Sequence, residues 1–152
     1  MQTVEDDAGK RYLLVKRSGE SSLVRDPDTG AERYLPNADL DPVDDAATLV
    51  VASEGVPASV RRVLTAVRDE RSLGLLLELV DRGPLPVRTL LSAYDLCESD
   101  LHGTLTEFRA AGLVEEARVA GERGYAATDL AVDAAERLRS GGADTDEELG
   151  EW

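Results

Sequence analysis

Residues 71–125 read RSLGLLLELVDRGPLPVRTLLSAYDLCESDLHGTLTEFRAAGLVEEARVAGERGY, and they carry the strongest structural pattern in the chain. Apolar residues recur at the spacing of an amphipathic helix in three successive segments, 73–80, 87–93 and 98–111. Gly112 follows the third segment, where a glycine commonly ends a helix. Strand-forming residues at 113–119 and 124–127 then flank a short tip at 120–123. The pattern predicts three helices followed by a two-stranded ribbon.

The residues before this stretch predict a small sheet. Strand formers occupy 11–17, 21–26 and 31–35, and Asp26-Pro27-Asp28-Thr29-Gly30 has the composition of a tight turn. Three helices followed by a two-stranded wing are the layout of a winged helix-turn-helix. The sequence therefore predicts an α+β protein, in which a winged helix-turn-helix domain is preceded by a small antiparallel β-meander of three or four strands.

Composition divides the chain into four parts. We expect a small β-sheet accessory domain at 1–45 and a linker at 46–57, with a short ordered piece inside it. The winged helix-turn-helix domain is expected at 58–139, and a disordered acidic tail at 140–152. Helical spacing of apolar residues predicts two flanking helices in the winged domain, one through Val60, Val63, Leu64 and Val67 and one through Leu130, Ala134 and Leu138.

The charge of the chain is strongly acidic. Its 17 Lys and Arg stand against 31 Asp and Glu, for a net charge of −14, and it has only two lysines and no isoleucine. This composition is typical of proteins from extreme halophiles, such as halophilic archaea, in which excess carboxylate keeps proteins dispersed. We therefore interpret the charge as a solvated surface in preference to a site for a cationic partner.

Several function classes lack their signature residues. The single cysteine, Cys97, has no disulfide partner, and with a single histidine, His102, it leaves zinc without a ligand set. No apolar run approaches the ~20 residues that span a bilayer, and no signal-peptide pattern begins the chain. The nucleophile-elbow, P-loop and zinc-protease motifs are missing as well. We expect a cytoplasmic protein that is not an enzyme, with no catalytic residues, cofactor, metal or membrane partner.

The spacing of residues from 96 to 114 matches a known pattern. The matching positions are Leu96, Cys97, Ser99, Leu101, His102, Leu105, Phe108, Gly112, Leu113 and Val114. This segment resembles the recognition segment of ArsR/MarR-type winged-helix regulators of bacteria and archaea, and the resemblance extends over about 58–139. It implies a DNA-binding transcription regulator whose partner is double-stranded DNA and whose third helix enters the major groove.

The resemblance also implies candidate DNA-binding residues. On the third helix, the candidate base readers are Ser99, Asp100, His102 and Thr104. The candidate contacts to the DNA backbone are Arg88 and Thr89 at the start of the second helix, Arg109, and Arg118 and Arg123 beside the wing tip. Arg88, Arg118 and Arg123 also have a simpler interpretation as ordinary exposed side chains.

Three questions stay open in the sequence. The segment 98–109 holds three acids and one base, unlike the basic surfaces that usually face phosphate, so a protein–protein interaction module without direct DNA reading is the alternative function. The helices at 58–68 and 129–139 could pair two protomers into a homodimer, or the first could cover the sheet. Cys97 could be a structural residue or, at a helix N-terminus, a redox sensor.

Overall fold

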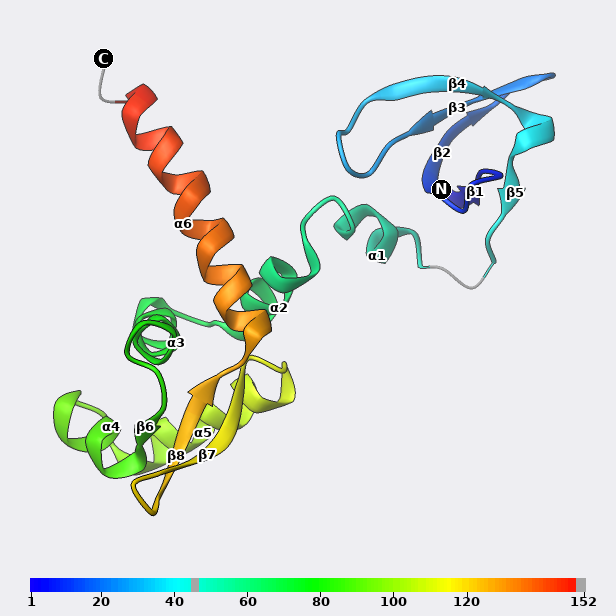
Figure 1. Cartoon of the computed structure of the whole chain (residues 1–152). Helices are drawn as coiled ribbons and strands as arrows, with labels where there is room; N and C mark the ends of the chain where they lie inside the picture. The colour runs from blue at the N-terminus through cyan, green and yellow to red at the C-terminus, as the bar shows by residue number, and fades with distance from the viewer. Residues whose placement is uncertain (45–46, 150–152) are drawn as a thin grey trace. The chain divides into compact units, whose positions relative to one another are not determined.

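The computed structural model describes residues 1–44 and 47–149, with side chains up to residue 141. The chain forms two compact units, Met1–Ala58 and Ser59–Trp152 (Figure 1). The α+β fold class is confirmed, with antiparallel strands in both units and the winged helix-turn-helix in the second.

The first unit is a five-stranded antiparallel sheet in the order β4-β3-β2-β1-β5. Its elements are β1 (Gln2–Glu5), β2 (Arg11–Arg17), β3 (Ser21–Arg25), β4 (Glu32–Pro36), the 3-10 turn η1 (Asn37–Asp39), β5 (Asp41–Pro42) and the helix α1 (Thr48–Ser53). The three expected strands are present. The short strands β1 and β5 were not expected, because four and two residues carry little alternation and Pro42 disfavours a strand.

The hairpins β1–β2 and β3–β4 hold their tyrosines at different positions relative to the residue pair that closes each loop. Tyr12 lies one residue beyond the closing pair of Glu5 and Arg11, but Tyr34 lies two residues beyond the closing pair of Arg25 and Glu32. A shift of one residue moves a side chain to the other face of a sheet. Tyr12 is therefore buried with Val4 and Val24, but Tyr34 is 60 % exposed.

Residue 46 of the expected linker 46–57 lies outside the described residues, and the rest of the segment is packed against the first sheet. Within it, α1 contacts β1 and β2 and buries Val51. A Cβ on Gly55 would lie 2.1 Å from the carbonyl oxygen of Pro27, so this loop also lies directly against the turn between β3 and β4. The described part of the segment belongs to the first unit, because α1 covers an apolar face of the sheet that would otherwise be exposed to water.

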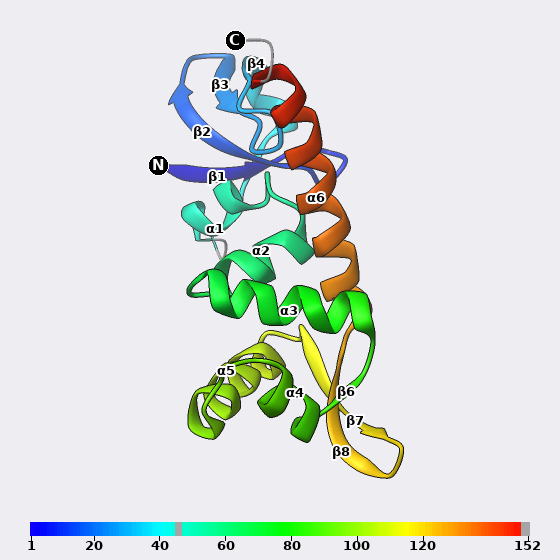
Figure 2. The same ribbon diagram turned by 90° about the vertical axis from the view of Figure 1, so that its left-hand side faces the viewer.

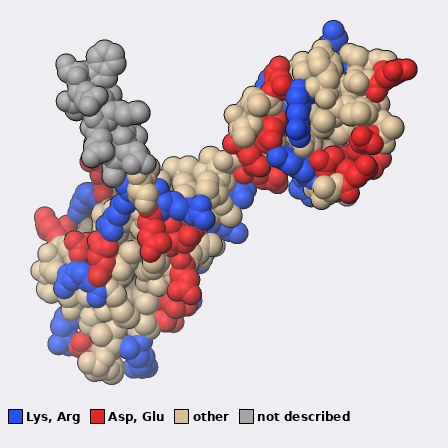
Figure 3. Space-filling view, turned by 45° about the horizontal axis from the view of Figure 1, so that its top comes forward, with Lys and Arg blue, Asp and Glu red and all other residues tan. Residues whose placement is uncertain are grey.

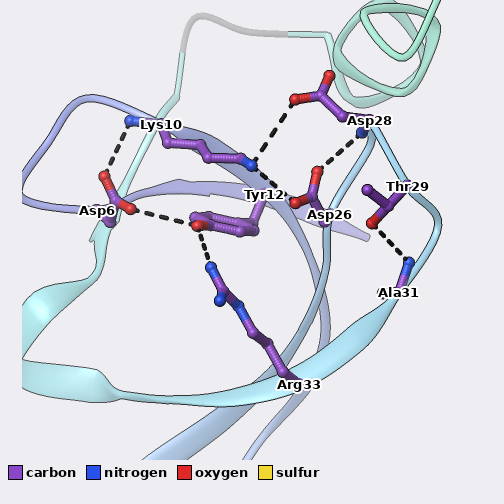
Figure 4. A network of polar contacts seen from close by, with 8 residues as sticks. All are labelled: Asp6, Lys10, Tyr12, Asp26, Asp28, Thr29, Ala31 and Arg33. Atoms are coloured by element: carbon purple, nitrogen blue, oxygen red, sulfur yellow. Dashed lines mark hydrogen bonds and ion pairs between the residues drawn. The ribbon is translucent and has the colours of Figure 1, made fainter.

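Around Tyr12, a polar network joins the turn between β1 and β2 to the turn between β3 and β4 (Figure 4). Nζ of Lys10 donates to Asp26 at 2.7 Å, and the Tyr12 hydroxyl accepts from Arg33 and donates to Asp6. The hydrogen bond from Lys10 lowers the pKa of Asp26, and the same bond raises the pKa of Lys10. Both groups are therefore charged at neutral pH.

This network predicts acid sensitivity of the first unit. A carboxyl whose folded pKa is lowered stabilises the fold above its unfolded pKa, and this stability is lost as the pH falls through the folded value, which here lies below 3.8. Asp26→Asn is expected to lower the urea midpoint at pH 7 and to have little effect well below pH 3.8. NMR signals of β2 and β3 amides during urea titrations at the two pH values would measure this.

The control for that substitution is Asp28→Asn. Asp28 lies 3.7 Å from the same ammonium group, but its side chain is 59 % exposed, compared with 14 % for Asp26. Its loss is expected to matter less, because exposed pairs contribute little. Equal urea midpoints for the wild type and Asp26→Asn at pH 7 would contradict the assigned role of the Lys10–Asp26 pair.

The second unit is the winged helix-turn-helix, flanked by a helix on each side. Its elements are α2 (Ala58–Ala66), α3 (Glu70–Arg82), β6 (Leu85–Pro86), α4 (Val87–Ala93), α5 (Glu98–Ala110), β7 (Val114–Val119), β8 (Glu122–Ala127) and α6 (Asp129–Leu149). In Figure 2, α4, α5 and the β7–β8 wing lie on one side of α3, with α6 on the other. The strand β6 adds an unexpected third strand to the wing, in the order β6-β8-β7.

The core of this unit forms where α3, α4 and α5 meet the wing. The apolar positions Leu101, Leu105 and Phe108 of α5, which the helical spacing placed on one face, are all buried. Local capping sets the helix ends: the Asp69 carboxylate accepts from the backbone N–H of Ser72 at the start of α3.

The two flanking helices bury part of their apolar stripes. Leu64 on α2 is 63 % exposed and Leu138 on α6 is 39 % exposed, so the apolar stripe of each helix is buried only in part. Among the side chains of α6 that the structure describes, the buried ones are the small residues Ala131, Ala134 and Ala135, which form a narrow stripe.

The end of α6 differs from the sequence-based expectation. The segment 140–152 was expected to be disordered, but α6 continues to Leu149, and residues 150–152 lie outside the described residues. Extending an existing helix does not repeat the cost of nucleation, so a helix held by tertiary contacts can continue through a poor sequence. Those contacts include a two-pronged ion pair from Arg139 to Asp81 of α3, with both N–O distances at 2.8 Å.

Candidate nucleic-acid interface

The helix α5 presents one face to the core and another to solvent. It begins after Cys97, whose thiol makes no capping hydrogen bond, and the chain leaves it at Gly112 with a positive φ of 75°. The exposed positions include Ser99, Asp100 and His102, and Thr104 is half-buried. The candidate base readers are therefore accessible, but they do not share one surface.

A groove of about 710 Å³ separates α5 from the wing strand β8. Ser99 and His102 line it from α5, and Arg123 and Tyr125 line it from β8. The phenol oxygen of the buried Tyr125 accepts a hydrogen bond from Arg123 at 3.2 Å, and this bond raises the pKa of Arg123. The groove thus combines hydroxyl and imidazole groups and the carboxylate of Glu98 with a permanently charged guanidinium.

A second hollow, of about 380 Å³, lies on another flank of α5. Asp100 and Thr104 line it together with Arg68 and Glu107, and Ser99 borders both hollows. Glu107 forms an ion pair with Arg68, so one of the three acids of α5 is neutralised within the unit. The four candidate readers are therefore divided between the wing side and the α3 side of the helix.

The candidate arginines near the wing form a cluster around one glutamate. Oε1 of Glu116 lies 3.1 Å from Nη1 of Arg109 and 3.2 Å from Nη2 of Arg123. Arg118 is the direct cross-strand partner of Arg123 and donates to the carbonyl of Gly121 at the tip. We call Arg109, Arg118, Arg123 and Glu116 the wing cluster; it contains three positive charges and one negative charge.

The remaining two candidates, Arg88 and Thr89, lie at the start of α4. Arg88 is 85 % exposed and reaches Glu122 of β8 at 3.4 Å, a long ion pair that holds it weakly. Thr89 is half-buried one position further along. The structure places Arg88 beside β8, so it borders the wing but lies outside the wing cluster.

The acidity of the chain is unevenly distributed along the sequence. Residues 59–141 hold eleven arginines and fourteen acidic residues, but residues 1–58 hold six basic and twelve acidic residues, and 142–152 add five acids without a base. Figure 3 shows basic and acidic side chains interleaved over the visible face of the second unit. The stretch 59–141, which carries the candidate interface, is therefore closer to electrical balance than the rest of the chain.

Three residues of the interface were missing from the candidates: Glu116, Tyr125 and Arg68. Alternation along β7 places Glu116 and Arg118 on the same face, and this was readable from the sequence. The contacts of Tyr125 and Arg68 depend on segments far away in the chain, so no local signal identified them.

The described residues contain no group of three or more His, Cys, Asp or Glu side chains placed to hold a metal ion. In the same part of the chain, no helix combines the length and apolar character needed to cross a membrane. Cys97 is exposed, with its Sγ 3.5 Å from the Ser99 hydroxyl.

These features define the second unit as a winged helix-turn-helix with an exposed third helix and an arginine-bearing wing. The chain belongs to a family of unknown function, DUF7346, whose model matches residues 1–139. None of the curated proteins matches it.

Two solved structures are similar to the chain. An ArsR-like transcriptional regulator from Rhodococcus sp. RHA1 is 27 % identical over 62 % of this chain and 89 % of that one, with a TM-score of 0.44. The crystal structure of another ArsR family transcriptional regulator is 17 % identical over 60 % of this chain and 94 % of its own, with a TM-score of 0.41. Because both TM-scores are below 0.5, neither similarity carries an argument about function.

Proposed function

We propose that the protein is a cytoplasmic DNA-binding transcription regulator that reads double-stranded DNA with α5 and the wing. The observation that carries this proposal is the groove between α5 and β8, where Ser99 and His102 face Arg123. An exposed helix of this kind fits the major groove of B-DNA, and a wing beside it reaches the backbone.

The residues divide into two roles in this proposal. Ser99 and His102 are base readers, because hydroxyl and imidazole groups can both donate and accept hydrogen bonds. Asp100 can accept a hydrogen bond from a cytosine amino group, and Thr104 lies on the same flank of α5 as a second base reader. Arg88, Thr89, Arg109, Arg118 and Arg123 contact phosphates, which position the protein without reading sequence.

The proposal must account for the acidic residues Glu98 and Asp100 in the first turn of α5. In molar salt, as expected for a halophilic protein, the Debye length is ~3 Å and long-range repulsion between carboxylates and phosphates is screened. Direct hydrogen bonds then decide binding. Some acidity on the reading helix is therefore compatible with DNA binding in that solvent.

We further propose that two chains pair through α2 and α6. Within residues 59–141, the exposed large apolar side chains are Leu64 and Leu138, which lie on these two helices. Burying them against a second copy would remove them from water, and paired readers suit a two-fold symmetric operator. Each chain of the dimer would then present its own α5 to one half-site of the operator.

The test combines chromatin immunoprecipitation in the native host with duplex binding by the purified chain. Sharp peaks that share a palindromic motif, together with a two-chain mass in sedimentation equilibrium, are expected. Arg118→Ala should weaken binding to that motif and reduce the slope of log affinity against log salt by about one. Arg17→Ala, an exposed arginine of the first unit, is the charge-matched control and should leave the slope unchanged.

The rival function is a winged-helix module that binds another protein and does not read DNA. It is favoured by the exposed acidic residues at the start of α5, Glu98 and Asp100, which suit a basic protein surface. Absence of discrete peaks, no duplex binding by the wild type at low salt and a stoichiometric co-purifying protein would support this rival and reject DNA reading.

A further inference from the structure

The wing holds two positive charges in an unfavourable arrangement. Arg118 and Arg123 are direct cross-strand partners, and like charges at such positions repel each other. Glu116 precedes Arg118 by two residues on β7, so its side chain lies on the same face of the ribbon. An anion at this point offsets the repulsion, and in the free protein that anion is the Glu116 carboxylate.

A single oxygen of Glu116 is shared by guanidinium groups from two separate elements. Arg109 approaches Oε1 from α5 and Arg123 from β8, at 3.1 and 3.2 Å. Arg123 is held further by its hydrogen bond to Tyr125 and lies 6.0 Å over that ring. The position of Oε1 is therefore a point of convergence for arginine donors, which is the arrangement that binds a phosphate oxygen.

We infer that the wing cluster is a binding site for one phosphate of the DNA backbone, and that Glu116 occupies this site in the free protein. The identity of the ligand rests on the proposed function. Without Glu116, the site has three positive charges and no counter-ion. A hollow of about 230 Å³, lined by Glu116, Ala117, Arg118 and Arg123, leaves space beside the carboxylate for the incoming phosphate.

Displacement of Glu116 then becomes part of DNA binding. The carboxylate must leave both arginines before the phosphate can take its place, so Glu116 weakens the affinity for DNA. Glu116 lowers the affinity for every DNA sequence by the same factor, because contacts to phosphates do not depend on the identity of the bases. Glu116 thereby restricts stable binding to sites where base contacts add enough free energy.

The substitution that tests this is Glu116→Gln, which keeps the shape of the side chain and removes its charge. It is expected to tighten binding to a labelled duplex at least about fivefold and to steepen the salt dependence by about one phosphate. The matched control is Glu115→Gln: Glu115 is exposed on the other face of β7, opposite Ala126, and its loss changes the net charge equally. Fluorescence anisotropy over a series of KCl concentrations gives both quantities.

A second measurement does not depend on DNA. Titration with inorganic phosphate, followed by the side-chain Nε–Hε NMR signals of Arg109 and Arg123, is expected to shift these signals at lower concentration in Glu116→Gln than in Glu115→Gln. If the two variants behave alike toward both duplex and phosphate, Glu116 does not occupy a phosphate site, and the proposed function is untouched. If the two variants differ in their response to inorganic phosphate but neither they nor the wild type bind duplex DNA, the anion site is supported and the proposed DNA-reading function is rejected.

Discussion

Replacing Phe108 by alanine is expected to lower the free energy of unfolding of the second unit by about 3–5 kcal/mol. Phe108 is completely buried, and it anchors α5 in the core cluster with Leu101 and Leu105. Truncation removes the apolar surface that the ring buries and leaves a cavity that a close-packed core fills only in part. Since domains are stable by ~5–15 kcal/mol, the loss is a large share of the total.

Urea unfolding followed by circular dichroism at a helical wavelength measures this loss, because the helices α2 to α6 belong to the second unit. Thr106→Ala provides the control on the same helix, where the side chain is exposed and donates only to the carbonyl of His102. Its effect is expected to stay within about 0.5 kcal/mol. A Phe108→Ala chain as stable as the control would mean that α5 is not held by this core.

The second large effect is expected for Gly124→Ala in the wing. A Cβ at Gly124 would lie 2.4 Å from the carbonyl oxygen of Leu85 and 3.0 Å from Cα of Pro86. These are backbone atoms of β6, so no flexible side chain can move aside, and the pairing of β6 with β8 must open. We expect a loss of about 1–3 kcal/mol in stability, and weaker duplex binding because the wing loses its support.

Gly103→Ala is the matched control for this change. It makes the same chemical substitution in α5, where the added Cβ would meet no atom within 4 Å apart from its chain neighbours and the backbone of its own helix. Because alanine favours a helix over glycine, this variant is expected to be more stable than the wild type by about 1 kcal/mol. Opposite signs for the two glycines, measured by thermal unfolding, would support the assigned close contact; a neutral Gly124→Ala would contradict it.

Elements with strong local signals could be predicted from the sequence. The expected and observed bounds agree for α4 at Val87–Ala93 and for β2 at Arg11–Arg17. The end of α5 was also expected, because Gly112 takes the left-handed conformation that stops a helix. Periodicity and stop residues act over a few neighbours along the chain, so they can be read without knowing the fold.

Elements held by distant partners could not be predicted in this way. The two residues of β6 become a strand because Leu85 pairs with Tyr125, which lies in the wing. Pro86 argues locally against a strand. The same holds for the 46–57 segment: its composition resembles a linker, but contacts of α1 with β1 and β2 attach it to the sheet.

For the candidate interface, the sequence by itself determined the kind of scaffold and the side chains available on α5 and the wing. Only the tertiary structure decided how these side chains are grouped. It places His102 toward the wing and Asp100 and Thr104 on the other flank, with Ser99 between the two. It also pairs Glu107 with Arg68, and Glu116 with Arg109 and Arg123. Hydrogen bonds and ion pairs depend on separations of a few ångströms between segments far apart in the chain, and folding alone sets those separations.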